Sequence, residues 1–126
     1  MKKALFFGLV LFAFTAAVSS TPSNPLVGRW QHKFSNGDVV LTNFRPDGSF
    51  DAFVNGKAFA NGQYTVKQDV FTVSDAQCGL NYTGSYKASF YSGTDSVRFT
   101  AVRDSCRGRR RSIDGSTLGR VKPAKR

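Results

Sequence analysis

The side chains that could carry out chemistry are few, and His32 stands first because it is the only histidine in the chain. An imidazole can act as a general base or as a metal ligand near neutral pH. A zinc site needs three or four protein ligands, however, and no second histidine is available. The sequence also contains no Glu, no Gly-x-Ser-x-Gly pattern and no His-Glu-x-x-His pattern. We therefore predict a protein that is not an enzyme and that requires no metal or other cofactor.

The first 20 residues have the pattern of an export signal. Lys2 and Lys3 precede an apolar run over residues 4–14, and small residues follow as far as Ser20. The run is shorter than the roughly 20 apolar residues that a membrane-spanning helix needs. We predict that residues 1–20 are a signal peptide, cut between Ala17 and Ser20. The mature chain would then be periplasmic or extracellular, without a transmembrane segment.

Cys78 and Cys106 are the only cysteines in the chain. An exported chain enters an oxidising compartment, where disulfides form and persist. An even number of cysteines in such a chain is typical of complete pairing. We therefore expect one disulfide between these two residues.

Residues 26–34, which read LVGRWQHKF, alternate between two kinds of side chain. Trp30, His32 and Phe34 fall on one face, and charged or polar residues fall on the other. A period of two residues is typical of a β-strand with one buried face. Trp30, the only tryptophan, is therefore expected to point into the core, together with His32.

The rest of the chain continues as short alternating segments separated by turn signals, such as Pro46-Asp47-Gly48. The predicted strands after the first cover residues 39–45, 49–55, 58–66, 70–74, 84–91, 96–104 and 106–113. An irregular connection is expected over residues 75–83, and no amphipathic helical run is present. We predict an all-β fold, a single up-and-down antiparallel β-barrel of about eight strands over residues 21–113. Closure of the sheet would remove its exposed edges.

Strand alternation also selects the side chains that should face the interior. The candidates for lining a pocket there are His32, Phe34, Phe44, Phe50, Tyr64, Tyr86, Phe90 and Phe99. These rings could fill the barrel completely or could surround a small apolar cavity. A barrel of about eight strands has an interior just wide enough for either outcome, and short strands favour a filled core.

Positive charge is concentrated near the C-terminus. The chain has a net charge of +10, and residues 103–126 hold half of its 18 Lys and Arg residues. We predict that residues 114–126 form a basic, disordered tail. Such a tail would attract an anionic envelope polymer or a lipid surface. Nucleic acid is not an expected partner, because residues 103–126 lack the aromatic side chains on which single strands stack.

The segment Gly28-Arg29-Trp30 resembles the Gly-x-Trp opening of the lipocalins and their calycin relatives. Residues 25–113 look like the short, exported lipocalin-like domains of bacteria. The matching segments, besides the first, are Pro46-Asp47-Gly48, Gly62-Gln63-Tyr64, Gly84-Ser85-Tyr86 and Asp104-Ser105-Cys106-Arg107-Gly108-Arg109.

In that family an arginine of the last strand packs across the tryptophan of the first strand. The resemblance implies this structural role for Arg109 on Trp30, with Arg111 as the second candidate. A guanidinium group over an indole face contributes roughly 0.5–2 kcal/mol.

The resemblance implies an exported, lipocalin-like protein that binds a small apolar or amphipathic ligand without catalysis. The alternative is a protein-interaction module of the cell envelope, similar to barrels that act as inhibitors. In that case the core would be filled and the basic tail would contact anionic partners.

Overall fold

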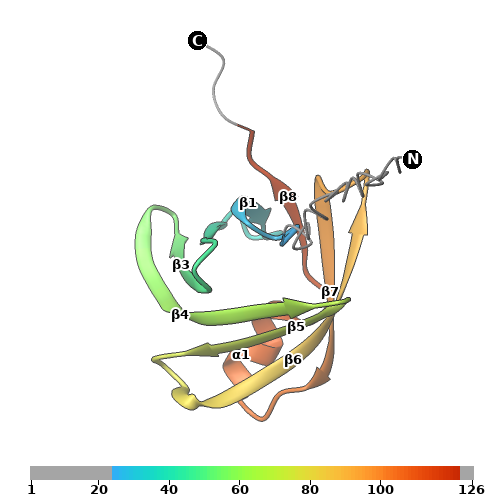
Figure 1. Ribbon diagram of the computed structural model, residues 1–126. Coiled ribbons are helices and arrows are strands. Elements are labelled where there is room, and N and C mark those ends of the chain that lie inside the picture. The colour runs from blue at the N-terminus through green and yellow to red at the C-terminus, as the bar shows by residue number, and fades with distance from the viewer. Residues whose placement is uncertain (1–23, 123–126) are drawn as a thin grey trace, which may run out of the picture.

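The computed structural model describes residues 24–122, which form one closed barrel of antiparallel strands (Figure 1). The strands are β1 (Gly28–Lys33), β2 (Val39–Phe44), β3 (Ser49–Val54), β4 (Lys57–Lys67), β5 (Val70–Asp75), β6 (Gly79–Tyr91), β7 (Ser96–Arg103) and β8 (Thr117–Arg120). Each strand pairs with its neighbour in the chain, and β8 pairs with β1 to close the barrel. The predicted all-β fold is therefore confirmed. The predicted signal peptide, residues 1–20, lies outside the described residues.

Two of the predicted strands differ from the structure. The sixth strand, β6, begins at Gly79, so much of the expected irregular connection over residues 75–83 is strand. Residues 106–113 were expected to form the last strand, but most of them form the short helix α1 (Arg107–Ile113). Arg109 is the buried residue of α1, and Ile113, one helical turn later, packs against the core and is partly buried.

The eighth strand lies further along the chain than predicted. It is β8, which falls within the stretch expected to be a disordered tail, and its Leu118 is buried in the core. The barrel therefore extends past residue 113, at least to Arg120. Residues 123–126 lie outside the described part of the chain.

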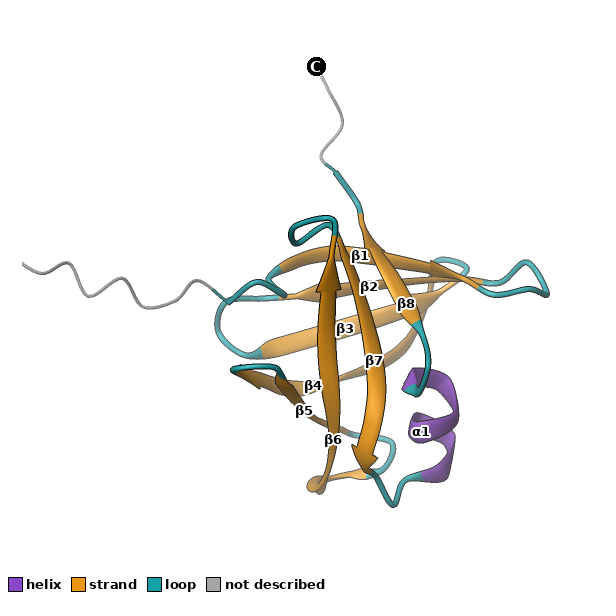
Figure 2. Cartoon of the chain, turned by 90° about the vertical axis from the view of Figure 1, so that its right-hand side faces the viewer, coloured by secondary structure: helices purple, strands orange, loops and turns teal. Residues whose placement is uncertain are grey.

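The barrel has two different ends, which Figure 2 shows from the side. At the helix end lie α1, the turns at residues 34–38 and 55–56, and the β5–β6 connection. At the opposite end, the Trp30 end, lie the segment before β1 and the turns at residues 45–48, 68–69 and 92–95. Since neighbouring strands are antiparallel, each strand carries residues from one end to the other.

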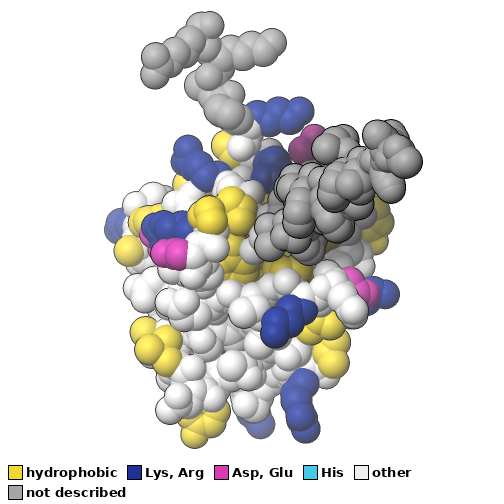
Figure 3. Space-filling model, in the orientation of Figure 1, with side chains coloured by type: hydrophobic (Ala, Val, Ile, Leu, Met, Phe, Trp, Pro, Cys, Tyr) yellow, Lys and Arg dark blue, Asp and Glu magenta, His cyan; other side chains and the backbone are white. Residues whose placement is uncertain are grey.

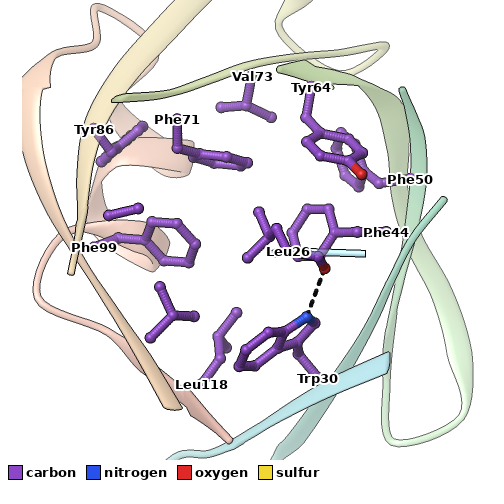
Figure 4. Packing of buried hydrophobic residues seen from close by; sticks show 12 residues of the cluster. Leu26, Trp30, Phe44, Phe50, Tyr64, Phe71, Val73, Tyr86, Phe99 and Leu118 are labelled. Atoms are coloured by element: carbon purple, nitrogen blue, oxygen red, sulfur yellow. Dashed lines mark hydrogen bonds between the residues drawn. The ribbon is translucent and has the colours of Figure 1, made fainter. Parts of the chain in front are cut away.

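The core is aromatic and fills the Trp30 end, as Figure 4 shows. Trp30 is fully buried, and its indole Nε1 donates a hydrogen bond to the Leu26 carbonyl at 2.8 Å. Phe44 and Tyr64 meet edge to face with their ring centroids 4.8 Å apart. The prediction that Trp30 faces inward is confirmed, and its polar nitrogen is satisfied by the segment that covers this end.

The arginine that packs on Trp30 is Arg120 of β8, and the assignment of this role to Arg109 is wrong. The Arg120 guanidinium carbon lies 4.3 Å from the centre of the indole ring. Its side chain also donates to the carbonyls of Val27 at 2.9 Å and Pro25 at 2.7 Å. The wrong assignment followed from the missed helix, because the last strand starts after Arg109 rather than before it.

Gly28 is required by this arrangement. Its φ of 133° lies in a region that L side chains rarely adopt, and a Cβ there would be only 2.7 Å from Nη1 of Arg120. The absent side chain therefore leaves room for the arginine.

The two Gly-x-Tyr segments have a similar explanation. A Cβ on Gly62 would overlap the backbone of β5 at Ser74, and a Cβ on Gly84 would overlap the Asp104 carboxylate. Close approach at these points, rather than turn formation, accounts for both glycines.

Candidate functional site

A cavity of about 730 Å³ occupies the helix end of the barrel. Its wall is mostly apolar, and its rim includes the exposed side chains of Phe59, Gln77 and Arg111. The strands contribute His32, Val40, Thr42, Phe44, Ala52, Val54, Phe59, Ala60, Phe71, Val73, Asp75, Phe99 and Leu118. Turns, α1 and the adjoining loops contribute Phe34, Asp38, Gln77, Cys78, Cys106, Gly108, Arg109, Arg111, Ser112, Ile113 and Ser116.

Half of the side chains predicted to line a pocket do so. The four found in the cavity wall are His32, Phe34, Phe44 and Phe99. The other four, Phe50, Tyr64, Tyr86 and Phe90, belong to or pack against the core cluster and are absent from the wall. The barrel is thus filled at the Trp30 end and hollow at the helix end. The sequence left open a filled core or an apolar cavity, and each describes one end of the barrel.

Several wall residues were not among the predicted pocket-lining candidates. Val40 and Thr42 share a face with Phe44 on β2, and Ala52 and Val54 share a face with Phe50 on β3. Alternation along each strand could have found them. The contribution of α1 could not be found in this way, because the segment was interpreted as a strand.

His32 reaches the cavity wall but is held by the barrel itself. Its Nδ1 lies 2.7 Å from the Thr117 carbonyl oxygen, which can only accept, so Nδ1 carries the proton and donates. Its ring also meets Phe34 edge to face, with centroids 4.5 Å apart. The histidine therefore bridges β1 and the start of β8 while it presents one edge to the cavity.

The most constrained polar group at the site is the buried Arg109 of α1. Its guanidinium donates to both carboxylate oxygens of Asp104, from Nε and from Nη2, each at 2.8 Å. Nη1 donates to Asp75 at 3.2 Å, and Nη2 also donates to the Tyr82 carbonyl at 3.1 Å. The arginine thus attaches α1 to β5, to β6 and to the end of β7.

Asp104 is fully buried and serves as the centre of this cluster. Burial alone would raise the pKa of its carboxyl group, but hydrogen bonds from Arg109, Tyr86 and the Cys106 backbone outweigh it and hold the pKa at about 2. Burial and donation to Asp104 raise the pKa of Tyr86, which keeps its hydroxyl protonated as a donor.

The disulfide joins the β5–β6 connection to the residue that precedes α1. Cys78 and Cys106 are bonded, with their Cα atoms 6.1 Å apart, which confirms the predicted pair. The backbone N–H of Cys78 donates to Asp75, and that of Cys106 donates to Asp104, each at 2.9 Å. The disulfide and the Arg109 cluster therefore fix α1 together, and both border the cavity.

Acidification should weaken the fold through Asp104. Its folded pKa of about 2 lies below the unfolded value of 3.8, so its stabilisation is complete above about pH 4 and is lost as the pH falls toward 2. The shift corresponds to about 2 kcal/mol of unfolding free energy. Urea unfolding followed across this pH range would measure the loss.

Asp104→Asn is the comparison that isolates this carboxyl group. The variant should be less stable near pH 6 and should lose less of its remaining stability between about pH 4 and pH 2. Parallel stability curves for the two proteins would contradict the assignment.

Within residues 24–122, no group of three or more His, Cys, Asp or Glu side chains could hold a metal ion. Every buried side-chain nitrogen or oxygen in this part of the chain has a hydrogen-bond partner. The two buried charged residues of the cavity wall, Asp75 and Arg109, are paired with each other within the fold. The one described helix is too short and too polar to cross a membrane.

Fold and cavity together define a small, disulfide-linked β-barrel with an internal site at one end. No protein-family model matches the chain, and no curated protein matches it in sequence.

Proposed function

We propose that the protein is an exported, lipocalin-like barrel that binds one small apolar or amphipathic molecule in the cavity, without catalysis. The observation that carries the proposal is the cavity of about 730 Å³, whose wall is mostly apolar. Sites for small molecules typically have volumes of about 300–1,000 Å³, with few polar groups among apolar ones. The ligand's apolar part would contact Val54, Phe71 and Phe99, and its polar part would remain near the rim.

Two further observations support the lipocalin-like part of the proposal. An arginine of the last strand packs over the tryptophan of the first, as the resemblance implied, although the residue is Arg120. The disulfide and the signal-like first 20 residues agree with export. The rival function, an interaction module with a filled core, is less well supported because the helix end is hollow.

Displacement of a fluorescent probe would test the proposal. The probe 1-anilinonaphthalene-8-sulfonate should brighten on binding, and fatty acids or retinoids that fit the cavity should displace it. Trp30 is a poor reporter for this purpose because it is buried away from the cavity wall.

A cavity-filling substitution should reduce ligand binding. Ala60 lies in the wall, and Ala60→Phe would place a ring in the cavity and weaken probe binding by about tenfold or more, which is about 1.4 kcal/mol. The matched control is Ala58→Phe, on the same strand, because Ala58 is exposed and does not line the cavity. Equal binding by the two variants, or no displacement by any ligand, would contradict the proposal.

A further inference from the structure

Exposed apolar side chains lie around the helix end. Phe59, Leu80 and Tyr82 are 49%, 60% and 63% exposed, which is unusual for large apolar residues in one neighbourhood. Phe59 stands at the cavity rim, where Gln77 Nε2 donates to its carbonyl at 2.6 Å. Leu80 and Tyr82 are at the start of β6, and the Tyr82 carbonyl accepts from Arg109 of α1. Phe59 and α1 line the same cavity, and the Tyr82 carbonyl contacts Arg109, so these two residues lie near the helix. Leu80 lies two positions before Tyr82 on β6.

The outer face of α1 is basic. Arg107, Arg110 and Arg111 are all exposed, and Arg110 and Arg111 follow Arg107 by three and four residues, so the three share one side of the helix. Asp114 is the acidic residue grouped with them on the surface. Arg109 points the other way and is neutralised by buried carboxylates, so its charge adds nothing to this face.

In the orientation of Figure 1, α1 lies behind β5 and β6, so its basic face is turned away from the viewer in Figure 3. The yellow hydrophobic side chains at the lower left of Figure 3 lie where Figure 1 places the β5–β6 connection.

We propose that this surface, the docking face, binds an anionic lipid bilayer, so that the cavity rim meets the membrane. The docking face consists of Phe59, Leu80, Tyr82, Arg107, Arg110 and Arg111. Arginines near an anionic bilayer are attracted to its surface potential, and aromatic and aliphatic side chains enter the headgroup region. The proposal goes beyond ligand binding, because it concerns the surface around the cavity and does not depend on the cavity's occupant.

A lipid surface fits better than a soluble polyanion because of the apolar residues. A polyanion would neutralise the arginines but would leave Leu80, which has no polar atoms in its side chain, in water. The acyl boundary of a bilayer would cover it. Phe59 belongs to both the docking face and the cavity wall, so a docked molecule would face the membrane with its cavity.

Sedimentation with vesicles would test the docking face. Vesicles of phosphatidylcholine containing about one third phosphatidylglycerol should bind the protein, and vesicles of phosphatidylcholine alone should bind it at least about tenfold more weakly. The combined substitution Arg107→Gln, Arg110→Gln and Arg111→Gln should reduce binding to the anionic vesicles by about tenfold or more.

The charge-matched control is Arg29→Gln, Lys67→Gln and Lys87→Gln, which removes three exposed charges outside the helix end. It should retain binding within about twofold, because it leaves the docking face intact. Both termini stay unchanged in every variant. Equal losses in the two triple variants, or no loss in either, would overturn the proposal.

Leu80→Ser separates a membrane from a soluble polyanion. It should weaken vesicle binding severalfold and leave retention on immobilised heparin unchanged. If this variant binds vesicles undiminished, and heparin retention depends on the three arginines, the partner of the docking face is a polyanion rather than a lipid surface. A double variant, Arg107→Gln and Arg110→Gln with Arg111 unchanged, should still bind the fluorescent probe in the absence of vesicles. Failure of docking and failure of ligand binding are therefore distinguishable.

Discussion

Replacing Arg109 by methionine is expected to lower the free energy of unfolding by about 3–5 kcal/mol. The substitution keeps most of the side-chain volume but leaves Asp104, which is fully buried, and Asp75, which is nearly so, without their cation. Removing one partner of a buried ion pair leaves a desolvated charge, and that penalty is larger than the net benefit of the pair. Urea unfolding near pH 7 would measure the change.

The control lies next to it on the same helix. Arg110 is exposed, so Arg110→Met should change the unfolding free energy by less than about 0.5 kcal/mol. Arg109→Lys should fall between the two, since it retains the charge but loses the paired hydrogen bonds to Asp104. Equal stabilities of the Arg109→Met and Arg110→Met proteins would show that the buried cluster contributes nothing.

Removal of the disulfide by Cys78→Ser and Cys106→Ser is expected to cost about 3–4 kcal/mol. The bond closes a loop with a sequence separation of 28, and loop-closure entropy in the unfolded chain gives a cost of this size. Reduction of the unchanged protein with dithiothreitol should produce the same loss, whereas the double variant should not respond to the reductant. A response of the variant would point to an effect elsewhere in the molecule.

The disulfide and the Arg109 cluster should also be coupled. Both connect the β5–β6 region to the start of α1, and the cluster's carboxylates accept hydrogen bonds from the two cysteine N–H groups. Groups in one network show interaction energies of about 0.5–3 kcal/mol in double-mutant cycles. Combining Arg109→Met with loss of the disulfide should therefore differ by this amount from the sum of the separate effects.

The strands from β1 to β5 could be predicted from the sequence because their signals are local. Alternation placed Trp30 and Phe44 inward, and the turn at Pro46-Asp47-Gly48 is marked by residues with fixed conformational preferences. The closed all-β architecture followed from these elements. Nothing non-local was needed for this part of the fold.

The C-terminal part was mispredicted because its signals are non-local. Arg109 and Ile113 are the two residues of α1 that are not exposed, and two such residues are too few to define a helical period. Leu118 is the single buried residue of a four-residue strand rich in small and polar residues, which resembles a loop. Only the pairing of β8 with β1 and β7 identifies it as part of the barrel.

The sequence could predict which side chains point into the barrel but not which of them border a cavity. Alternation correctly put Phe44, Phe50 and Tyr64 on the inside, yet only Phe44 reaches the cavity. Which rings fill the barrel and which border an empty space depends on packing across strands far apart in the sequence. The ion cluster of Arg109 was missed for the same reason, since Asp75 lies 34 residues before it.

The seam between β1 and β8 implies a particular order of assembly. A hydrogen bond from Arg120 to Val27 joins residues 93 positions apart, and the same arginine covers Trp30. A chain that emerges from a ribosome or a translocation pore N-terminus first exposes its tryptophan long before the covering arginine arrives. Until β8 is available, the edge of β1 has no strand to pair with, and long-range closure of this kind is slow. For this molecule, the interval before the seam forms is the period of greatest risk of self-association.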